Sequence, residues 1–116
     1  MEETLYGHKF KFVLHLASIA APEDYQTHPV EALKANSVGT LQALEIARKY
    51  DSIFLFTSTS EIYGDANFIP TPENYRGNVN PIGRRSSYGV GKRFSEALCK
   101  AFDRKNGRAR CMIIEC

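Results

Sequence analysis

The sequence predicts an α/β fold in which parallel strands alternate with helices. Three apolar runs rich in β-forming residues are separated by two segments with helical periodicity. Strands that alternate with helices in this way form parallel sheets, joined by right-handed crossovers. We expect a βαβαβ unit within a single domain, residues 1–116, with strands at 10–18, 52–58 and 108–116 and helices at 30–50 and 88–105.

The composition is that of an ordinary soluble domain. Hydrophobic residues make up 43% and charged residues 24% of the chain, which argues against disorder. The net charge is +2 and the basic residues are scattered, so no nucleic-acid partner is expected. No apolar run approaches the ~18 residues that span a membrane, and no signal peptide is evident. Cys99, Cys111 and Cys116 form no C-x-x-C pair, which favours a reduced, cytoplasmic protein without a metal site.

The first helix is predicted to follow a loop, IAAPEDYQTHP, that contains two prolines. Pro29 suits the first turn of a helix, because proline lacks the N–H that this turn leaves unbonded. Arg48 and Lys49 would lie in the last turn, where cations are favoured. The spacing predicts one broad apolar face that contains Leu33, Val38, Leu41 and Leu44.

The central strand, SIFLFTS, is apolar without alternation, which is typical of a strand covered on both faces. A long polar segment rich in proline, glycine and asparagine follows it, and so long a loop in a compact domain is usually functional. Ser86 or Ser87 can cap the next helix, and Asn106-Gly107 suits its end.

Polar side chains follow two of the predicted strands, in HLAS (15–18) and TSTSE (57–61). Ligands of open parallel sheets bind beyond the carboxyl ends of the strands, so these side chains stand where a ligand would bind. Hydroxyl groups that bond only to the local backbone are the alternative explanation.

Tyr88 and Lys92 are four residues apart and would share one face of the last helix. An ammonium beside a phenol favours the phenolate, which can act as a general base near neutral pH. A solvated tyrosine with a surface lysine is the alternative. Gly89 and Gly91 lower helix stability, so they suggest close approach of another backbone or of a ligand, or else a weakly formed first turn.

Taken together and in order, these motifs resemble those of the extended short-chain dehydrogenases/reductases, the NAD-dependent nucleotide-sugar epimerases and dehydratases. His15-Leu16-Ala17 matches the group's H-x-A, and Thr57 to Gly64 matches [ST]-[ST]-x-x-x-[VI]-Y-G. Tyr88 to Lys92 matches Y-x-x-x-K, and KANSVGT (34–40) is similar to T-N-x-x-G-T. The resemblance implies a Rossmann-like fold and NAD as the cofactor.

Within this group, the chain most resembles the UDP-glucuronate decarboxylases, because YRGNVNPIG (75–83) is similar to their Y-W-G-x-V-N-P-I-G loop. Related epimerases share such loops, so epimerisation and dehydration stay open. The resemblance implies a nucleotide sugar, most simply a UDP-sugar, as the substrate. It also implies a homodimer formed through the helices at 30–50 and 88–105.

The resemblance also implies a role for each site residue. Tyr88 would take the proton of the sugar 4-hydroxyl while hydride passes to NAD, and Thr59 would bond the same oxygen. Lys92 would hold the nicotinamide ribose and lower the pKa of Tyr88. Glu61 and Ser60 would lie near C5, where a decarboxylase loses its carboxylate. Leu16, Ala17 and Ser18 would line the cofactor cleft, Ser58 would lie near the nicotinamide, Lys34 would contact the substrate, and Asn36 could be structural.

The match stops at both ends of the chain. The sequence contains no G-x-x-G-x-x-G turn for the pyrophosphate, and it ends at Cys116, where the group continues into a substrate domain. We therefore expect a partial Rossmann-like domain that lacks the Gly-rich half and the substrate domain. Three hypotheses follow: a fragment of the enzyme, a non-catalytic remnant that at most dimerises, or one half of a split enzyme.

Overall fold

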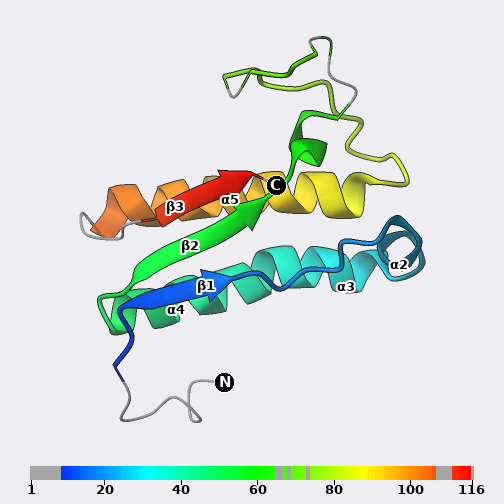
Figure 1. Cartoon of the computed structure of the whole chain (residues 1–116). Helices are drawn as coiled ribbons and strands as arrows, with labels where there is room; N and C mark the ends of the chain where they lie inside the picture. The colour runs from blue at the N-terminus through cyan, green and yellow to red at the C-terminus, as the bar shows by residue number, and fades with distance from the viewer. Residues whose placement is uncertain (1–8, 65–66, 68, 73, 107–110, 116) are drawn as a thin grey trace.

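Three parallel strands form the sheet of the computed structural model, which describes residues 9–64, 67, 69–72, 74–106 and 111–115. Strand β2 (Ile53–Ser58) lies between β1 (Phe12–His15) and β3 (Cys111–Glu115). Phe12 pairs with Ile53, and Phe54 pairs with Cys111. The predicted parallel α/β fold is confirmed (Figure 1). Strand β1 is shorter than the predicted strand at 10–18, because it pairs with β2 over only four residues. Strand β3 lies within the predicted strand at 108–116, of which residues 108–110 and 116 lie outside the described residues.

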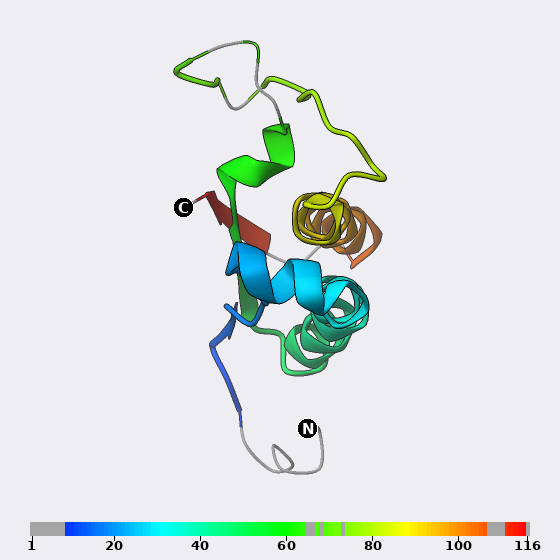
Figure 2. The same cartoon turned by 90° about the vertical axis from the view of Figure 1, so that its right-hand side faces the viewer.

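The helices lie on one side of this sheet (Figure 2). Helix α3 (Pro29–Lys34), a π-helical turn η1 (Ala35–Gly39) and α4 (Thr40–Lys49) form one helical run, which agrees with the predicted helix at 30–50. Helix α5 (Ser86–Asn106) returns beside them and agrees with the prediction at 88–105. The core lies between the sheet and the two longer helices, and consists of Ala43, Leu44, Ala47, Phe54, Phe56 and Cys99.

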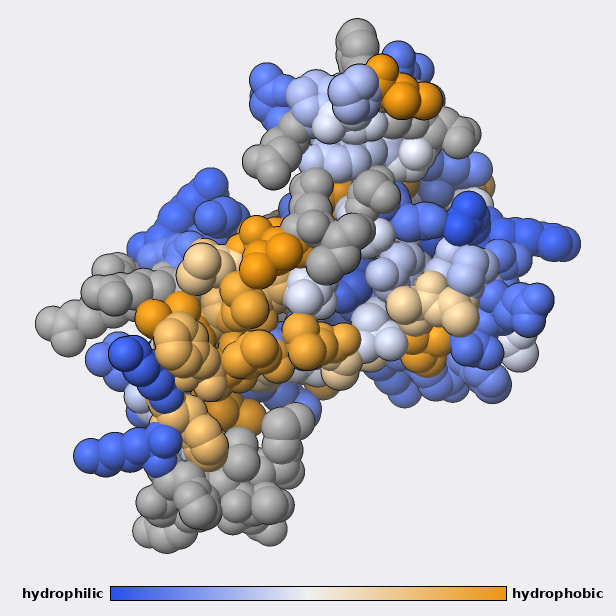
Figure 3. All heavy atoms as spheres, viewed as in Figure 1, coloured by the Kyte–Doolittle hydropathy of each residue, from blue (hydrophilic) through white to orange (hydrophobic). Residues whose placement is uncertain are grey.

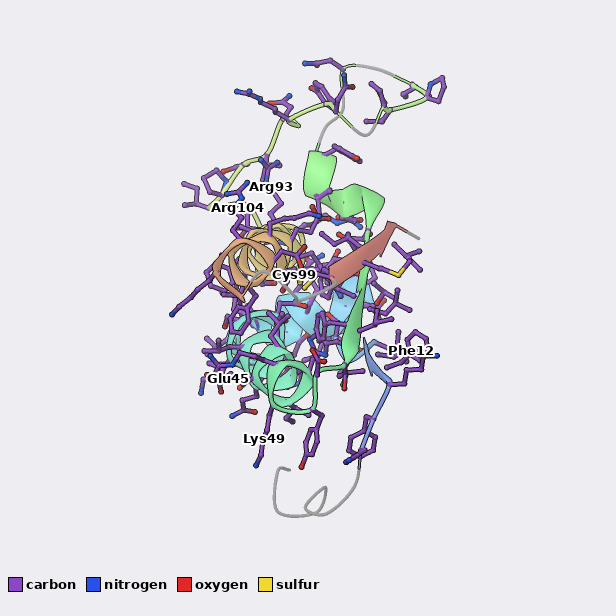
Figure 4. All side chains as sticks on the ribbon, turned by 90° about the vertical axis from the view of Figure 1, so that its left-hand side faces the viewer. Phe12, Glu45, Lys49, Arg93, Cys99 and Arg104 are labelled. Atoms are coloured by element: carbon purple, nitrogen blue, oxygen red, sulfur yellow. The ribbon has the colours of Figure 1, made fainter. Side chains whose placement is uncertain are left out.

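The opposite face of the sheet is apolar and open within the described part of the chain, so the prediction that β2 is covered on both faces is wrong there. The side chains of β2 alternate between buried and half-buried. Phe12, Leu14, Met112 and Ile114 are each about half exposed on the flanking strands. Figure 3 shows the resulting apolar patch over the strands, and in Figure 4 Phe12 points away from the helices.

The predicted apolar face of the first helix is also wrong. Only Leu44 enters the core, whereas Leu33, Val38 and Leu41 are exposed. The π-helical turn inserts an extra residue per turn and so rotates the helix face that follows it. Small and polar residues occupy the inward positions instead, among them Ala32, Asn36, Thr40 and Ala43.

The segment IAAPEDYQTHP is not simply a loop, because it contains a short helix, α2 (Pro22–Thr27). Pro22 begins the helix, and Glu23 and Asp24 lie in its first turn, where anions are favoured. In the long polar segment that follows β2, η2 (Ser60–Tyr63) forms a single 3₁₀ turn. None of the described helices is long and apolar enough to cross a membrane.

Candidate active site

The carboxyl ends of β1 and β2, the turn η2, helix α2 and the first turn of α5 meet at one end of the sheet (Figure 1). Leu16 and Ala17 follow β1 there and are exposed. Thr59 follows β2 and is buried at the start of η2. Because the strands are parallel, residues from distant parts of the sequence converge at this end.

Lys92 is buried inside this end of the molecule, with only 2% of its surface exposed. Its Nζ donates a hydrogen bond to the carbonyl oxygen of Thr57 at 2.9 Å. The same atom lies 4.7 Å from the centre of the Phe56 ring and 5.9 Å from the centre of the Tyr88 ring. The alternative of a surface lysine is therefore excluded, and the ammonium lies between the end of β2 and the ring of Tyr88.

Tyr25 of α2 stacks on the ring of Tyr88, a contact that the sequence did not predict. The two rings stack in parallel, with centres 5.1 Å apart and planes 5° from each other. Tyr25 is 1% exposed, and its carbonyl oxygen accepts a hydrogen bond from Ser87 Oγ at 3.2 Å. The side chain therefore fixes the first turn of α5. Nothing local in the sequence marks Tyr25, because its partners are at least 60 residues away.

Arg85 connects Tyr25 to Glu61. Its Nη2 donates to Glu61 Oε1 at 2.7 Å, and its Nε donates to the Tyr25 hydroxyl at 3.0 Å. The hydrogen bond to Tyr25 and then the charge of Glu61 raise the pKa of Arg85 above its usual value. Arg85 therefore stays charged and orients the Glu61 carboxylate toward the start of α5.

Thr59 has a local role as well as a place in the site. Its Oγ1 accepts a hydrogen bond from the backbone N–H of Glu61 at 3.3 Å, which caps η2. The local explanation for the hydroxyls in TSTSE thus holds for this contact. A hydroxyl also has its own proton to donate, so Thr59 can cap the turn and at the same time donate a hydrogen bond to a ligand oxygen.

Gly89 and Gly91 are explained by close approach of neighbouring elements. A Cβ on Gly89 would lie 3.1 Å from the carbonyl oxygen of Glu61. A Cβ on Gly91 would lie 3.1 Å from Asn36 Cβ and 3.2 Å from Asn36 Nδ2. All three distances are tighter than normal contacts. The glycines therefore let η2 and η1 approach the helix that carries Tyr88 and Lys92.

Asn36 anchors a buried polar network behind the site. Its carbonyl oxygen accepts hydrogen bonds from Thr40 Oγ1 at 3.2 Å and from Ser95 Oγ, and Ser18 Oγ donates to its Oδ1 at 3.2 Å. Asn36 Nδ2 is buried without a hydrogen-bond partner among the described residues. Single π-helical turns such as η1 frequently occur at functional sites.

His15 at the end of β1 joins the same network. Its Nε2 lies 3.0 Å from Thr40 Oγ1, and the two share a hydrogen bond. Burial lowers the pKa of His15, and the charge of Lys92 lowers it further, although a hydrogen bond to the backbone of Ala35 opposes both. The imidazole is therefore neutral over a wider pH range than an exposed histidine.

Ser58, Lys34 and Ser60 are the remaining site residues that were proposed from the sequence. Ser58 is buried and donates to Glu96 Oε1, a carboxylate that sequence analysis did not single out. Lys34 is exposed at the end of α3, and none of the hydrogen bonds described above involves it. The side chain of Ser60 and all of Cys116 lie outside the described residues.

A cavity of about 330 Å³ adjoins Glu61 and the first turn of α5. Gly64 forms part of its wall at φ +61°, and a Cβ there would lie 2.1 Å from the carbonyl oxygen of Asn78. The glycine thus allows the segment around Asn78 to pass directly over η2. Arg84, Arg85 and Ser86 complete a polar wall that could accommodate an anionic group.

The residues present fit one part of a dinucleotide. The exposed Leu16 and Ala17 leave the end of β1 open, and the face of Tyr88 and Lys92 lies at the same end of the sheet. These residues suit the nicotinamide and its ribose. The 116-residue sequence supplies no Gly-rich turn for the pyrophosphate.

Comparison with known proteins gives the family. The sequence profile of the NAD dependent epimerase/dehydratase family matches residues 1–116. The chain belongs to this family. UDP-glucuronic acid decarboxylase 1 of Danio rerio is 44% identical over 95 residues, which cover 82% of this chain and 23% of the relative. UDP-glucuronic acid decarboxylase 5 of Arabidopsis thaliana is 47% identical over 95 residues, which cover 82% of this chain and 28% of that relative.

Solved structures agree with this membership of the epimerase/dehydratase family. UDP-glucose 4-epimerase of Thermotoga maritima, solved with UDP-glucose, superposes with a TM-score of 0.83 at 30% identity. The match covers 97% of this chain and 35% of that one. The Rossmann-like fold is thus confirmed, and the chain spans about a quarter of the length of the two decarboxylases.

Proposed function

We propose that this chain carries the acid–base centre of an NAD-dependent nucleotide-sugar enzyme that decarboxylates UDP-glucuronate. The observation that carries the proposal is the convergence of Thr59, Glu61, Tyr88 and Lys92 at one end of the sheet. The likeness to UDP-glucuronic acid decarboxylases supports the choice of substrate and reaction.

Each residue has a role that its position allows. Tyr88 removes the proton of the sugar 4-hydroxyl, and Thr59 donates a hydrogen bond to the same oxygen. Lys92 is a fixed cation 5.9 Å from the centre of the Tyr88 ring, and it would hold the nicotinamide ribose when NAD is bound. NAD, when bound, accepts the hydride from the sugar. Leu16, Ala17, Ser18 and Ser58 border the cofactor, and Lys34 borders the substrate.

Glu61 distinguishes decarboxylation from simple epimerisation in this proposal. Arg85 keeps the Glu61 carboxylate oriented at 2.7 Å, beside a cavity with two arginines in its wall. These arginines would balance the sugar carboxylate before it leaves as carbon dioxide. Glu61 and Ser60 then act as the acid/base groups for the proton that C5 gains.

The open apolar face of the sheet favours a second candidate function. Half-exposed Phe12, Leu14, Met112 and Ile114 would be covered if a separately made chain packed against this face of the sheet. The chain would then be one half of a split enzyme. The edge strands β1 and β3 also have backbone groups available for a further strand.

We also propose that the chain forms a homodimer through its helices. The helical run of α3, η1 and α4 and the neighbouring α5 present exposed apolar side chains, namely Val30, Leu33, Val38, Leu41 and Phe94. Such a surface suits a second copy of the same helices. A non-catalytic remnant would retain this dimerisation alone.

The free thiols of Cys99 and Cys111 support a reducing, cytoplasmic location.

The proposed function is tested by incubating the chain with NAD and UDP-glucuronate and measuring carbon dioxide. Tyr88→Phe should abolish turnover, whereas Tyr75→Phe, outside the site, should leave it unchanged. Undiminished turnover in Tyr88→Phe would contradict the assigned base. If the unaltered chain neither binds NAD nor releases carbon dioxide from UDP-glucuronate, the remnant hypothesis is favoured.

A further inference from the structure

The described wall of the cavity beside Glu61 has an uncompensated positive charge. The volume of about 330 Å³ lies at the low end of the ~300–1,000 Å³ range of small-molecule sites, so the cavity suits one sugar ring better than a nucleotide. The charged residues among its described lining are Glu61, Arg84 and Arg85. One carboxylate and two guanidinium groups leave one positive charge unbalanced, which suits a ligand that carries a negative charge.

Arg85 is the guanidinium that hydrogen bonds hold in place. Its Nε donates to the hydroxyl of Tyr25 at 3.0 Å, and its Nη2 donates to Glu61 Oε1 at 2.7 Å. Tyr25 is buried and stacked on Tyr88, so the first of these partners is itself fixed. The two bonds start from different nitrogens of one planar group, and they therefore fix both its position and its plane.

Arg85 also has donors left for a ligand. A guanidinium has five N–H groups, and the bonds to Tyr25 and Glu61 use two of them. Among the described residues, no further group accepts a hydrogen bond from Arg85. Its side chain is 57% exposed and lines the cavity, so a ligand there can reach it. Exposed ion pairs contribute little to stability, which leaves the orientation of both groups as the main effect of the pair.

Arg84, the other cation of the wall, has no such support. It is exposed, and it makes no hydrogen bond or ion pair within the described part of the chain. Its charge adds to the positive potential of the cavity, but no hydrogen bond to a described residue orients its side chain. Asn78 and Asn80 also lie in this wall, and side-chain amides suit the hydroxyl groups of a sugar.

We propose that Arg85 is a specificity-determining residue, through which this cavity selects a sugar that carries a carboxylate over the corresponding neutral sugar. The inference rests on the proposed function, since it names the group of the substrate that this site recognises. The N–H groups that Arg85 does not share with Tyr25 and Glu61 donate to the carboxylate. The planar guanidinium matches a carboxylate in geometry, and charge strengthens these hydrogen bonds. The hydroxymethyl group of a neutral sugar forms weaker ones.

Arg85 also acts on carboxylate binding through Glu61. Two carboxylates in one cavity repel each other unless a cation balances them. The ion pair of 2.7 Å balances the charge of Glu61, so a second carboxylate can enter beside it. Loss of Arg85 would therefore remove hydrogen-bond donors and leave the Glu61 charge to repel the ligand.

The test measures by NMR how the chain binds D-glucuronate and D-glucose, which differ only in the carboxylate at C6. The ¹⁵N-labelled chain is titrated with each sugar at constant pH and ionic strength. Glucuronate should shift the amide signals of Glu61, Gly64 and Gly89 and the Nε–H signal of Arg85, whereas glucose should leave them in place. Neither titration needs NAD or turnover.

Variants of the two arginines isolate the contribution of Arg85. Arg85→Gln should weaken glucuronate binding at least about tenfold, because hydrogen bonds to a charged group are lost. Arg84→Gln removes the same charge from the same wall and should weaken binding no more than about fivefold. Arg85→Lys keeps the charge without the fork of donors and should restore binding only in part. Both positions are exposed, and circular dichroism checks that each variant is folded.

Four results would overturn the proposal: no binding of glucuronate to the folded chain, equal affinity for glucuronate and glucose, equal losses in Arg85→Gln and Arg84→Gln, or equal affinity for glucuronate and acetate. In the last case the sugar ring would contribute nothing, and the cavity would bind any small anion. The proposed function fails separately, when a chain that selects glucuronate releases no carbon dioxide from UDP-glucuronate in the presence of NAD.

Discussion

Tyr25 contacts three residues at the start of α5, and so links the candidate base to the candidate carboxylate. Its ring stacks on Tyr88, its hydroxyl accepts from Arg85, and its carbonyl accepts from Ser87. Arg85 in turn holds Glu61. One buried ring thus orients side chains from α2, η2 and α5, which a catalytic site requires of its supporting residues.

Replacement of Tyr25 should separate these contributions. Tyr25→Ala removes the buried ring and should lower the free energy of unfolding by about 3–5 kcal/mol. Tyr25→Phe keeps the stack on Tyr88 and loses only the hydrogen bond from Arg85, so it should cost about 0.5–1.5 kcal/mol. Urea unfolding followed by circular dichroism measures both. Equal losses in the two variants would mean that the ring stack contributes little.

His15 predicts how stability depends on pH. Its folded pKa is lowered, so near pH 6.5 and below the unfolded chain binds the proton more readily. Stability should therefore fall as the pH drops below about 6.5, by at most about 1.4 kcal/mol per pH unit from this group. Unfolding free energies between about pH 7.5 and 5.5 test the prediction.

Matched variants isolate the contribution of His15. His15→Gln should flatten the pH dependence, whereas His28→Gln, at an exposed histidine, should leave it unchanged. A chain that becomes more stable as the pH falls, or an unaltered slope in His15→Gln, would show that the buried imidazole is not the group responsible.

Helix α5 is shaped by contacts that oppose helix propensity. Gly91→Ala should gain about 1 kcal/mol in propensity but lose more, because its Cβ would meet Asn36 at 3.1 Å. We expect a net loss of about 1–2 kcal/mol. Gly39→Ala is the matched control, since its Cβ would meet only the Lys34 carbonyl oxygen, at 3.8 Å. That variant should be stabilised, by up to about 1 kcal/mol. Thermal unfolding measures both, and equal stabilisation would contradict the close packing.

Local sequence signals predicted the helices and strands well, but they predicted poorly which side chains of each element are buried. Strand β2 and helix α5 lie where an apolar run and a helical segment predict them. Ser86 and Ser87, proposed as caps, both lie inside α5, and Gly107 lies outside the described residues. The spacing of Tyr88 and Lys92 needs only the helix period. The π-helical turn at Ala35–Gly39, which rotates the face that follows it, has no such signal in the sequence.

Contacts between distant segments were also beyond the sequence. Tyr25 and Arg85 are 60 residues apart, and their hydrogen bond exists only after the fold has formed. The proline-rich segment around Tyr25 accordingly resembled a loop. Residues with a motif of their own, such as Thr59 and Glu61, could be proposed from the sequence. Supporting residues could not, because their role is defined by their partners.

The described part of the chain exposes an apolar surface on the sheet and another on the helices. If the helices form the proposed dimer, sedimentation equilibrium at micromolar concentration should show one. Leu41→Glu and Phe94→Glu should each weaken association by at least about tenfold, because a charge would be buried there.

A charge on the sheet face is the control for this surface. Leu14→Glu places the same charge on the open sheet face and should leave the dimer intact. If the unaltered chain is a monomer, the result contradicts the proposed dimer. Dissociation by Leu14→Glu alone would assign the contact to the sheet instead.

The most direct test of the account is to locate NAD on the chain by NMR. Titration of the ¹⁵N-labelled chain with NAD to millimolar concentration detects even weak binding, residue by residue. The account predicts shifted amide signals at the ends of β1 and β2 and in the first turns of α5, centred on Ala17, Ser58, Thr59 and Tyr88, and smaller shifts in Lys92→Met. Signals that shift only elsewhere, such as around Cys99, or not at all, would contradict the claim that this end of the sheet is the cofactor site.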